Sequence, residues 1–177
     1  MSKRELKKYV TELDKEQLEE QLVALYDKFP AVKVYYNFVF KPNETNLHRD
    51  AKLKISNEYY PAKGKRPKMR RSVAQKFIKH FITLGVDPYI ITDVMLYNIE
   101  TAQSLSAKKQ IVQQLFYKSM LNSFEQVVHF TIQQGIFIDF KDRIIKIEVE
   151  TKNQKWENSY FFEAVLEKSI TSELYSK

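Results

Sequence analysis

The sequence predicts an all-α fold, an irregular bundle of about seven or eight helices that forms one domain over residues 1–177. Two observations predict this class. Only three glycines and five prolines occur in the chain, whereas sheet-rich domains of this size need many more turn residues. Hydrophobic residues make up 44% of the sequence, and many recur at the three- and four-residue spacing of an amphipathic helix. A chain of this length is expected to bury a core.

Two capping boxes are expected to begin the first two helices. Ser2 with Glu5, and Asp14 with Gln17, have the spacing at which a cap and a residue three positions later bond each other's backbone N–H groups. An apolar stripe follows the second cap and extends that helix. Its residues are Leu18, Leu22, Leu25, Tyr26 and Phe29.

Residues 31–41, AVKVYYNFVFK, allow two interpretations. β-branched and aromatic residues alternate there in part, as they do in strands, yet the segment also suits a helix. We predict helix and leave the strand open.

Helix boundaries in the middle of the chain follow from caps and breakers. Asn43 or Thr45 is expected to cap a helix that Pro61 ends. The next helix is expected to begin at Ser72, through a capping box, and to close at Gly85, where glycine favours the left-handed C-terminal turn.

Two long helices are expected to follow. Asp87 can cap a helix whose first position is Pro88, since proline has its φ preset for the first turn. That helix is expected to reach about Gln103. Ser106 then opens a helix that runs to Gln134 and carries a wide apolar stripe.

The C-terminal part repeats the ambiguity between helix and strand. In residues 140–152, Ile145, Ile147 and Val149 alternate like a strand, while a helical spacing fits the same segment. The absence of turn residues on either side favours helix. A last helix is expected over residues 158–174.

The net charge of +7 is concentrated in one short segment. Residues 1–62 hold 11 basic and 10 acidic groups, residues 63–80 hold 8 and none, and residues 81–177 hold 10 and 12. The whole basic excess therefore lies within residues 63–80, and the rest of the chain is close to neutral.

Composition also bounds the compartment. The chain has no cysteine, which excludes a disulfide framework and thiolate metal sites and suits a reducing environment. Its N-terminus is charged from the third residue, and no stretch approaches the ~20 apolar residues of a membrane span. We expect a soluble cytoplasmic protein with no membrane contact.

The basic segment predicts a surface that binds phosphate. Six cations precede the helix expected at Ser72 and two more lie on it, where free backbone N–H groups and the positive end of the helix dipole also favour anions. Nucleic acid or another polyanion is the expected partner. The candidate residues are Lys63, Lys65, Arg66, Lys68, Arg70, Arg71, Lys76 and Lys79.

Two other readings of these charges stay open. The segment can be a solvated bend, partly neutralised by Asp87, Asp93 and Glu100 in the following stretch, which contains no lysine or arginine before residue 108. Alternatively, the protein is an interaction module without catalysis, and an acidic partner protein, or a second copy of the chain, docks on the same surface.

Aromatic residues near the basic segment offer a further option. Aromatic rings can stack on unpaired bases, but core packing is the favoured interpretation because most aromatics in a chain of this size fill the interior. The residues concerned are Tyr35, Tyr36, Phe38, Phe40, Tyr59 and Tyr60.

No catalytic or metal motif is recognisable. The three histidines are scattered, and only Glu125 and His129 stand one helical turn apart. Asp93 and Glu100 are seven residues apart, ~10 Å along a helix, which is too far for both to ligate one ion. No glycine series for a phosphate loop and no nucleophile elbow occurs. We expect no enzyme, no metal and no cofactor.

Two stretches carry a resemblance to a known family. KMRRSVAQKFIKHFITLGVDPYIITDVMLYNIETAQ at residues 68–103 and FYKSMLNSFEQVVHF at residues 116–130 resemble a family of short bacterial proteins of unknown function. The opening residues and YYNFVF extend the resemblance over most of the chain. It implies a small bacterial cytoplasmic protein and supplies no activity or functional residue.

Overall fold

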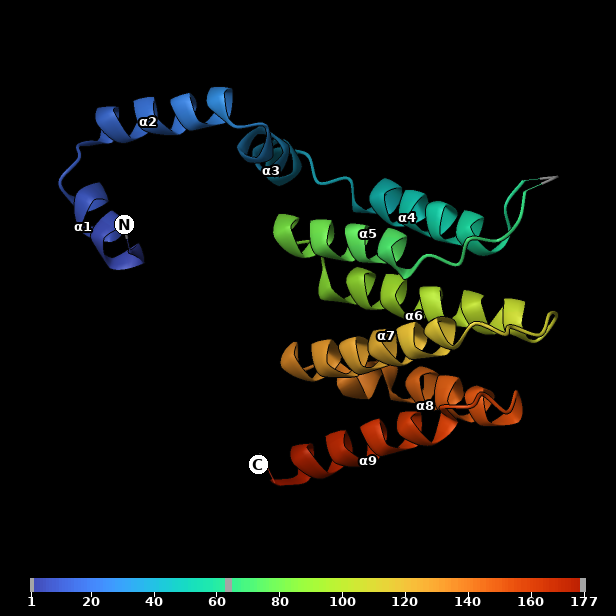
Figure 1. The fold of residues 1–177 in the computed structure, drawn as a ribbon. Helices are drawn as coiled ribbons and strands as arrows, with labels where there is room; N and C mark the ends of the chain where they lie inside the picture. The colour runs from blue at the N-terminus through green and yellow to red at the C-terminus, as the bar shows by residue number, and fades with distance from the viewer. Residues whose placement is uncertain (1, 63–64, 176–177) are drawn as a thin grey trace. The chain divides into compact units, whose positions relative to one another are not determined.

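A computed structural model describes residues 2–62 and 65–175 of the protein, with side chains described up to residue 169. These ranges contain nine α-helices and no strand (Figure 1), which confirms the all-α class. None of these helices is long and apolar enough to cross a membrane. The helices are α1 (Lys3–Thr11), α2 (Lys15–Lys28), α3 (Pro30–Phe40), α4 (Glu44–Tyr59), α5 (Arg71–Leu84), α6 (Pro88–Ser106), α7 (Gln114–Gln133), α8 (Phe137–Asn153) and α9 (Ser159–Tyr175).

The helix count exceeds the seven or eight expected from the sequence. The break between α2 and α3, which lies between two segments predicted separately, needs almost no turn residues. α2 and α3 are separated by Phe29 alone, whose φ of −116° and ψ of 110° are extended. The following Pro30 disfavours a helical conformation at Phe29, so this single residue suffices to end α2.

The helices divide into two compact units, Met1–Asn43 with α1 to α3 and Glu44–Lys177 with α4 to α9. Each unit is described by itself below. The single domain expected over residues 1–177 stays a prediction.

Unit 1, Met1–Asn43, has well-defined local structure. The capping boxes of Ser2 with Glu5 and of Asp14 with Gln17 are both formed, as predicted. Residues 30–40 are helical, so the helical interpretation of AVKVYYNFVFK is confirmed. No described residue of this unit is buried.

Unit 2, Glu44–Lys177, is built from helices whose chain directions alternate from one helix to the next. The loops after α4, α6 and α8 therefore lie at one end of this unit, and the loops after α5 and α7 lie at the other (Figure 1). α6 packs against α4, α5, α7 and α8 and supplies much of the core. Its side chains Val94, Leu96, Ile99 and Ala102 are fully buried.

Two predicted features of this unit are confirmed. Gly85 ends α5 in the left-handed conformation, with φ of 75°, and Asp87 caps α6 by accepting a hydrogen bond from the N–H of Tyr89. The segment at residues 140–152 is part of helix α8, where Ile144, Ile147 and Thr151 are buried. Their spacing of three and four residues is the period of a helix rather than a strand.

The start predicted for α5 is wrong by two residues. Ser72 does not cap it, and the N-cap is Arg70, which makes no side-chain capping bond. The preceding chain is instead fixed to α4, because the N–H groups of Lys68 and Met69 both donate to the backbone carbonyl of Glu58. This tertiary anchor, rather than a local capping box, sets the first turn.

The start predicted for α7 is also wrong. α6 continues to Ser106, residues 107–113 form a loop, and α7 begins at Gln114. The loop folds back because Ile111 is buried and its carbonyl accepts a hydrogen bond from the hydroxyl of Tyr117. A helix through this stretch would leave Ile111 outside the core pocket that it fills.

Aromatic rings join α7 to α9 in the core. Phe124 and Phe162 are both fully buried, with ring centroids 4.9 Å apart. Trp156, the only tryptophan in the sequence, precedes α9 and contacts both Phe162 and Phe116. This cluster fixes the loop between α8 and α9 at the same end of the unit as the loops after α4 and α6.

Candidate functional site

The cations of the loop between α4 and α5 are open to solvent. Lys65, Arg66 and Lys68 are exposed, and none forms an ion pair within 4.0 Å with another residue in the described ranges. Lys63, which was predicted to belong to the same site, lies outside the described residues.

Arg70 is held by a carboxylate of its own chain. Its Nε and Nη2 donate to the two carboxylate oxygens of Glu58 at 2.9 and 2.8 Å. These hydrogen bonds lower the pKa of Glu58, and the charge of Lys68 lowers it further. Arg70 therefore reaches a ligand only by giving up a bidentate pair, which is the stronger form of such contacts.

Arg71 points into the unit rather than outward. Its Nε donates to Ser123 Oγ at 2.8 Å and its Nη2 to Gln126 Oε1 at 3.0 Å, so it links α5 to α7. Burial lowers the pKa of the guanidinium. These contacts indicate that Arg71 positions two helices.

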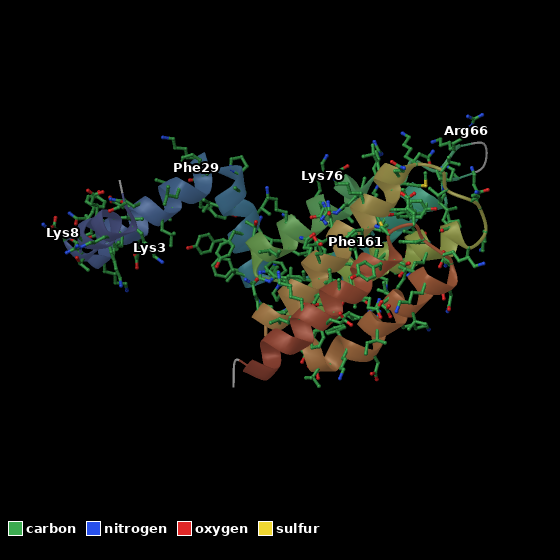
Figure 2. The ribbon with its side chains drawn as sticks, turned by 60° about the horizontal axis from the view of Figure 1, so that its bottom comes forward. Lys3, Lys8, Phe29, Arg66, Lys76 and Phe161 are labelled. Atoms are coloured by element: carbon green, nitrogen blue, oxygen red, sulfur yellow. The ribbon has the colours of Figure 1, made fainter. Side chains whose placement is uncertain are left out.

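Lys76 and Lys79 lie along α5, away from the loop. Both are exposed and without an ion pair among the described residues, and Lys79 borders a pocket of ≈500 Å³ that Arg71 also lines. Arg66 lies near the end of the loop, whereas Lys76 projects from the side of α5 (Figure 2). The predicted site residues are thus divided between two regions.

The folded chain brings other lysines to the loop cations. Arg66 and Lys109 line one pocket of ≈270 Å³. Lys109 also lines a second pocket of ≈380 Å³ together with Lys108 and Lys155. Lys108 lies over the ring of Tyr60, with Nζ 5.4 Å from its centroid. We call the following residues the basic end surface: Lys65, Arg66, Lys68, Lys108, Lys109 and Lys155.

Sequence reasoning missed the second half of this surface. Lys108 and Lys109 were predicted to lie within the long helix from Ser106 to Gln134, and Lys155 was not predicted to belong to a site. The available signal was topological, because antiparallel neighbouring helices place every second loop at the same end. A correct break between α6 and α7 was needed to use that signal.

Two residues in these loops have an unfavourable backbone. Met69 has φ of 52° and Lys155 has φ of 55°, a left-handed conformation that costs a residue with a Cβ roughly 1–2 kcal/mol. Such conformations persist where the surrounding structure holds them in place. The loops of the basic end surface are therefore shaped by tertiary contacts.

The carboxylates expected to neutralise the basic segment are used elsewhere. Asp87 caps α6, and Asp93 and Glu100 form an ion network with residues of α4 and α8. Of the acidic residues around the basic end surface, Glu58 is taken by Arg70 and Glu157 borders the next pocket, beside Lys118.

The ion network is a second polar cluster, which the sequence did not reveal. Asp93 Oδ2 contacts His48 Nε2 at 2.5 Å and Lys52 Nζ at 3.0 Å, and its Oδ1 accepts from Arg143 Nη1 at 2.6 Å. Burial alone would raise the pKa of Asp93, but these hydrogen bonds outweigh it and lower the pKa to about 2. The carboxylate is therefore ionised near neutral pH.

Arg143 connects the two acidic residues of α6. Its Nε and Nη2 donate to the carboxylate of Glu100 at 2.6 and 2.8 Å, and these bonds raise the pKa of the guanidinium. One guanidinium thus spans Asp93 and Glu100, which stand too far apart to share a small ion. In the part of the chain that the structure describes, no group of three histidine or acidic side chains could hold a metal.

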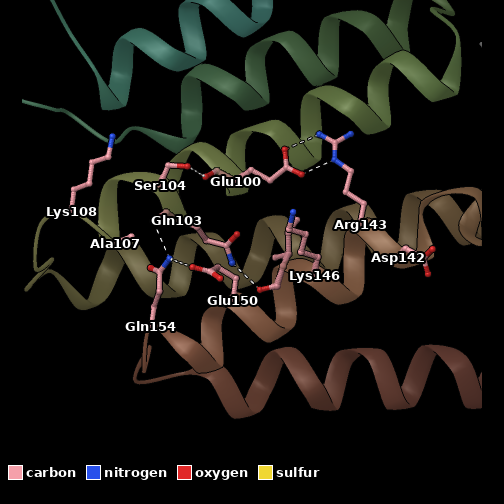
Figure 3. A pocket seen from close by; sticks show the side chains of 11 residues that line it. Glu100, Gln103, Ser104, Ala107, Lys108, Asp142, Arg143, Lys146, Glu150 and Gln154 are labelled. Atoms are coloured by element: carbon pink, nitrogen blue, oxygen red, sulfur yellow. Dashed lines mark hydrogen bonds and ion pairs between the residues drawn. The ribbon is translucent and has the colours of Figure 1, made fainter.

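A pocket of ≈840 Å³ opens beside this network, between α6 and α8 (Figure 3). Both signs of charge line it, including Lys108, Lys146 and Asp142. Gln103 and Ile147 also line it, and Gln103 Nε2 donates to the carbonyl of Ile147 at 2.7 Å. The mixture of charges gives this pocket no preference for anions, in contrast to the basic end surface.

The aromatic residues near the basic segment differ in exposure. Tyr59 is buried, donates to Asn98 Oδ1 at 3.1 Å and therefore belongs to the core. Tyr60 is exposed beside Lys108. The remaining ones lie in unit 1, where Tyr36 and Phe38 are half-buried and Tyr35 and Phe40 exposed.

The sequence matches a family over most of its length. A family model described as a family of unknown function, DUF6155, matches residues 1–169. The match confirms the predicted resemblance to a whole-chain family without a known activity. No curated protein and no solved structure matches the chain.

Proposed function

The chain belongs to the DUF6155 family of unknown function, and from its surface chemistry we propose that it binds nucleic acid through the basic end surface. The single observation that supports this proposal most is the convergence of six cations from three separate loops at one end of unit 2. None of the six has an ion pair within the described ranges.

Clustered cations without partners repel each other. Each close pair costs ~1 kcal/mol or less in water. An anion with several charges that lies across these cations offsets this repulsion and lowers the free energy. A nucleic acid backbone offers such charges at regular intervals. The two pockets joined by Lys109 make the cations of three loops parts of one continuous surface.

Helix ends contribute less than the lysines. α5 and α7 begin at this end without a side-chain N-cap, so their first N–H groups are open to an anion. α4, α6 and α8 end there, and the negative ends of their dipoles offset that effect. Contacts to phosphate should therefore come mainly from side chains and be independent of base sequence.

The test compares two double charge reversals. Arg66→Glu with Lys109→Glu removes two cations that line the same pocket, and we expect at least about tenfold weaker binding of a mixed-sequence oligonucleotide. The slope of log affinity against log salt should fall by about two. Fluorescence anisotropy of labelled single-stranded and duplex probes across a salt series measures both quantities.

The matched control is Lys141→Glu with Lys168→Glu, which changes the net charge equally but on α8 and α9, away from the loops. It should retain most of the affinity. Equal loss in both variants, or a wild-type dissociation constant weaker than about 10⁻⁴ M at physiological salt, would overturn the proposal.

An acidic protein partner is the competing outcome. Poly-glutamate carries a similar charge density without phosphate groups, so it serves as the probe for that alternative. Binding of poly-glutamate as tight as that of the oligonucleotide at the same salt concentration would favour an acidic docking partner. Binding of nucleic acid alone would support our proposal.

A further inference from the structure

The helices of unit 1 carry apolar stripes that nothing in the unit covers. Leu6 on α1 and Leu22 on α2 are 46% and 44% exposed, and no described residue of residues 2–43 is buried. A chain of about 40 residues rarely folds without a partner, a metal or disulfides. The sequence has no cysteine, which excludes disulfides. A partner surface would bury these stripes.

The two amphipathic helices carry opposite net charges. α1 contains four basic residues and one acidic residue, whereas α2 contains two basic and four acidic residues. Within the described part of unit 1, the one ion pair is Lys15 with Glu19, which lies inside α2. Two of the α1 cations, Lys3 and Lys8, are labelled in Figure 2.

The contact between α1 and α2 within one chain does not use these charges. Gln21 Nε2 donates to the hydroxyl of Tyr9 at 2.6 Å, and the apolar stripes on both helices stay exposed. The surface that would best cover α2 is apolar with a basic border, and the surface that would best cover α1 is apolar with an acidic border. α1 has an apolar stripe with a basic border and α2 has an apolar stripe with an acidic border, so each has the surface that would best cover the other.

We propose that a second copy of the chain covers unit 1, with α1 of one protomer packed on α2 of its partner. A two-fold axis forms this contact twice, because α2 of the first protomer then receives α1 of the partner. The buried apolar stripes supply the affinity, and the opposite charges favour this pairing over like-charged ones.

Self-association is tested first by mass. Sedimentation equilibrium of the full chain should give twice the 21.1 kDa of one protomer. Leu6→Gln combined with Leu22→Gln should give a monomer, because both apolar stripes are interrupted. Leu53→Gln is the control, since Leu53 is similarly exposed but lies on α4 in unit 2, and that variant should stay dimeric.

Charge reversal identifies which helices meet. Lys7→Glu with Lys8→Glu makes α1 acidic like α2, and Glu19→Lys with Glu20→Lys makes α2 basic like α1. Each double variant alone should dissociate at least about tenfold more readily than the wild type. An equimolar mixture of the two should associate again, since acidic α1 then meets basic α2 in one contact and basic α1 meets acidic α2 in the other.

The mixture separates a second copy from other partners. Recovery in the mixture supports the proposal. A monomeric wild-type chain overturns it. So does a mixture that stays monomeric when a single chain with all four reversals regains wild-type stability, because α1 and α2 then pair within one chain. Far-UV circular dichroism confirms that each variant keeps its helices.

Discussion

Phe124→Ala is expected to lower the free energy of unfolding by about 3–5 kcal/mol. Phe124 is fully buried in α7, and its ring lies 4.9 Å from that of Phe162 in α9. The substitution removes the apolar contact between these two helices and leaves a cavity, because the rigid aromatic neighbours can collapse only in part. This is the largest change in stability that we predict for any single residue.

Urea unfolding followed by tryptophan fluorescence measures this effect. Trp156 is the only tryptophan, is buried and lies 6.0 Å from Phe162 by ring centroid, so its emission reports on the same cluster. Phe161→Ala is the control, because Phe161 is 55% exposed on α9. It should change the unfolding free energy by less than about 0.5 kcal/mol. Equal effects of the two substitutions would contradict the packing described for α7 and α9.

Asp93→Asn is expected to destabilise unit 2 by about 2 kcal/mol near neutral pH. The amide keeps the shape of the carboxylate but loses its charge, so it no longer pairs with Lys52 and Arg143. The size follows from the pKa of Asp93, which is lowered from 3.8 to about 2 in the folded protein. Because the folded pKa lies below the unfolded one, the stabilisation is complete above about pH 4.

The same contribution is lost as the pH falls through about 2, where the folded carboxylate takes up a proton. The difference between wild type and variant should therefore shrink on acidification and vanish near pH 2. Urea unfolding at a series of pH values measures it. Asp142→Asn is the control, because Asp142 lines the neighbouring pocket but forms no ion pair within the described ranges. A difference that stays constant with pH would contradict the network.

Local signals in the sequence predicted local structure well. The capping boxes at Ser2 and Asp14, the proline after Asp87 and the glycine at residue 85 act on the backbone within one turn, so their effects can be derived without knowing the fold. Helix in the ambiguous segments was also predicted, because strands need turn residues that the chain lacks.

The wrong predictions concern helix boundaries that are determined by residues distant in the sequence. Ser72 has a good capping sequence, yet the N-cap of α5 lies two residues earlier, at Arg70, because Glu58 holds the preceding loop. The break before α7 exists because Ile111 fills a core position and Tyr117 binds its carbonyl. Neither cause can be read from neighbouring residues.

The candidate site shows the same division. Its basic half in residues 65–68 was predicted from charge density alone. Lys109 and Lys155 lie beside these residues because the helices alternate in direction, which places their loops at the same end of unit 2. Arg71 does not belong to the surface, because its guanidinium donates to Ser123 and Gln126.

By itself, the sequence determined that this chain is helical, where most helices begin, and that its positive charge is concentrated in one segment. Only the tertiary structure decided which cations face solvent together and which are bound by the chain's own groups. The physical reason is the separation in sequence over which each kind of interaction acts. Backbone preferences act over a few residues, whereas ion pairs and shared surfaces join residues that are distant in the sequence, such as Arg143 and Asp93, which are 50 positions apart.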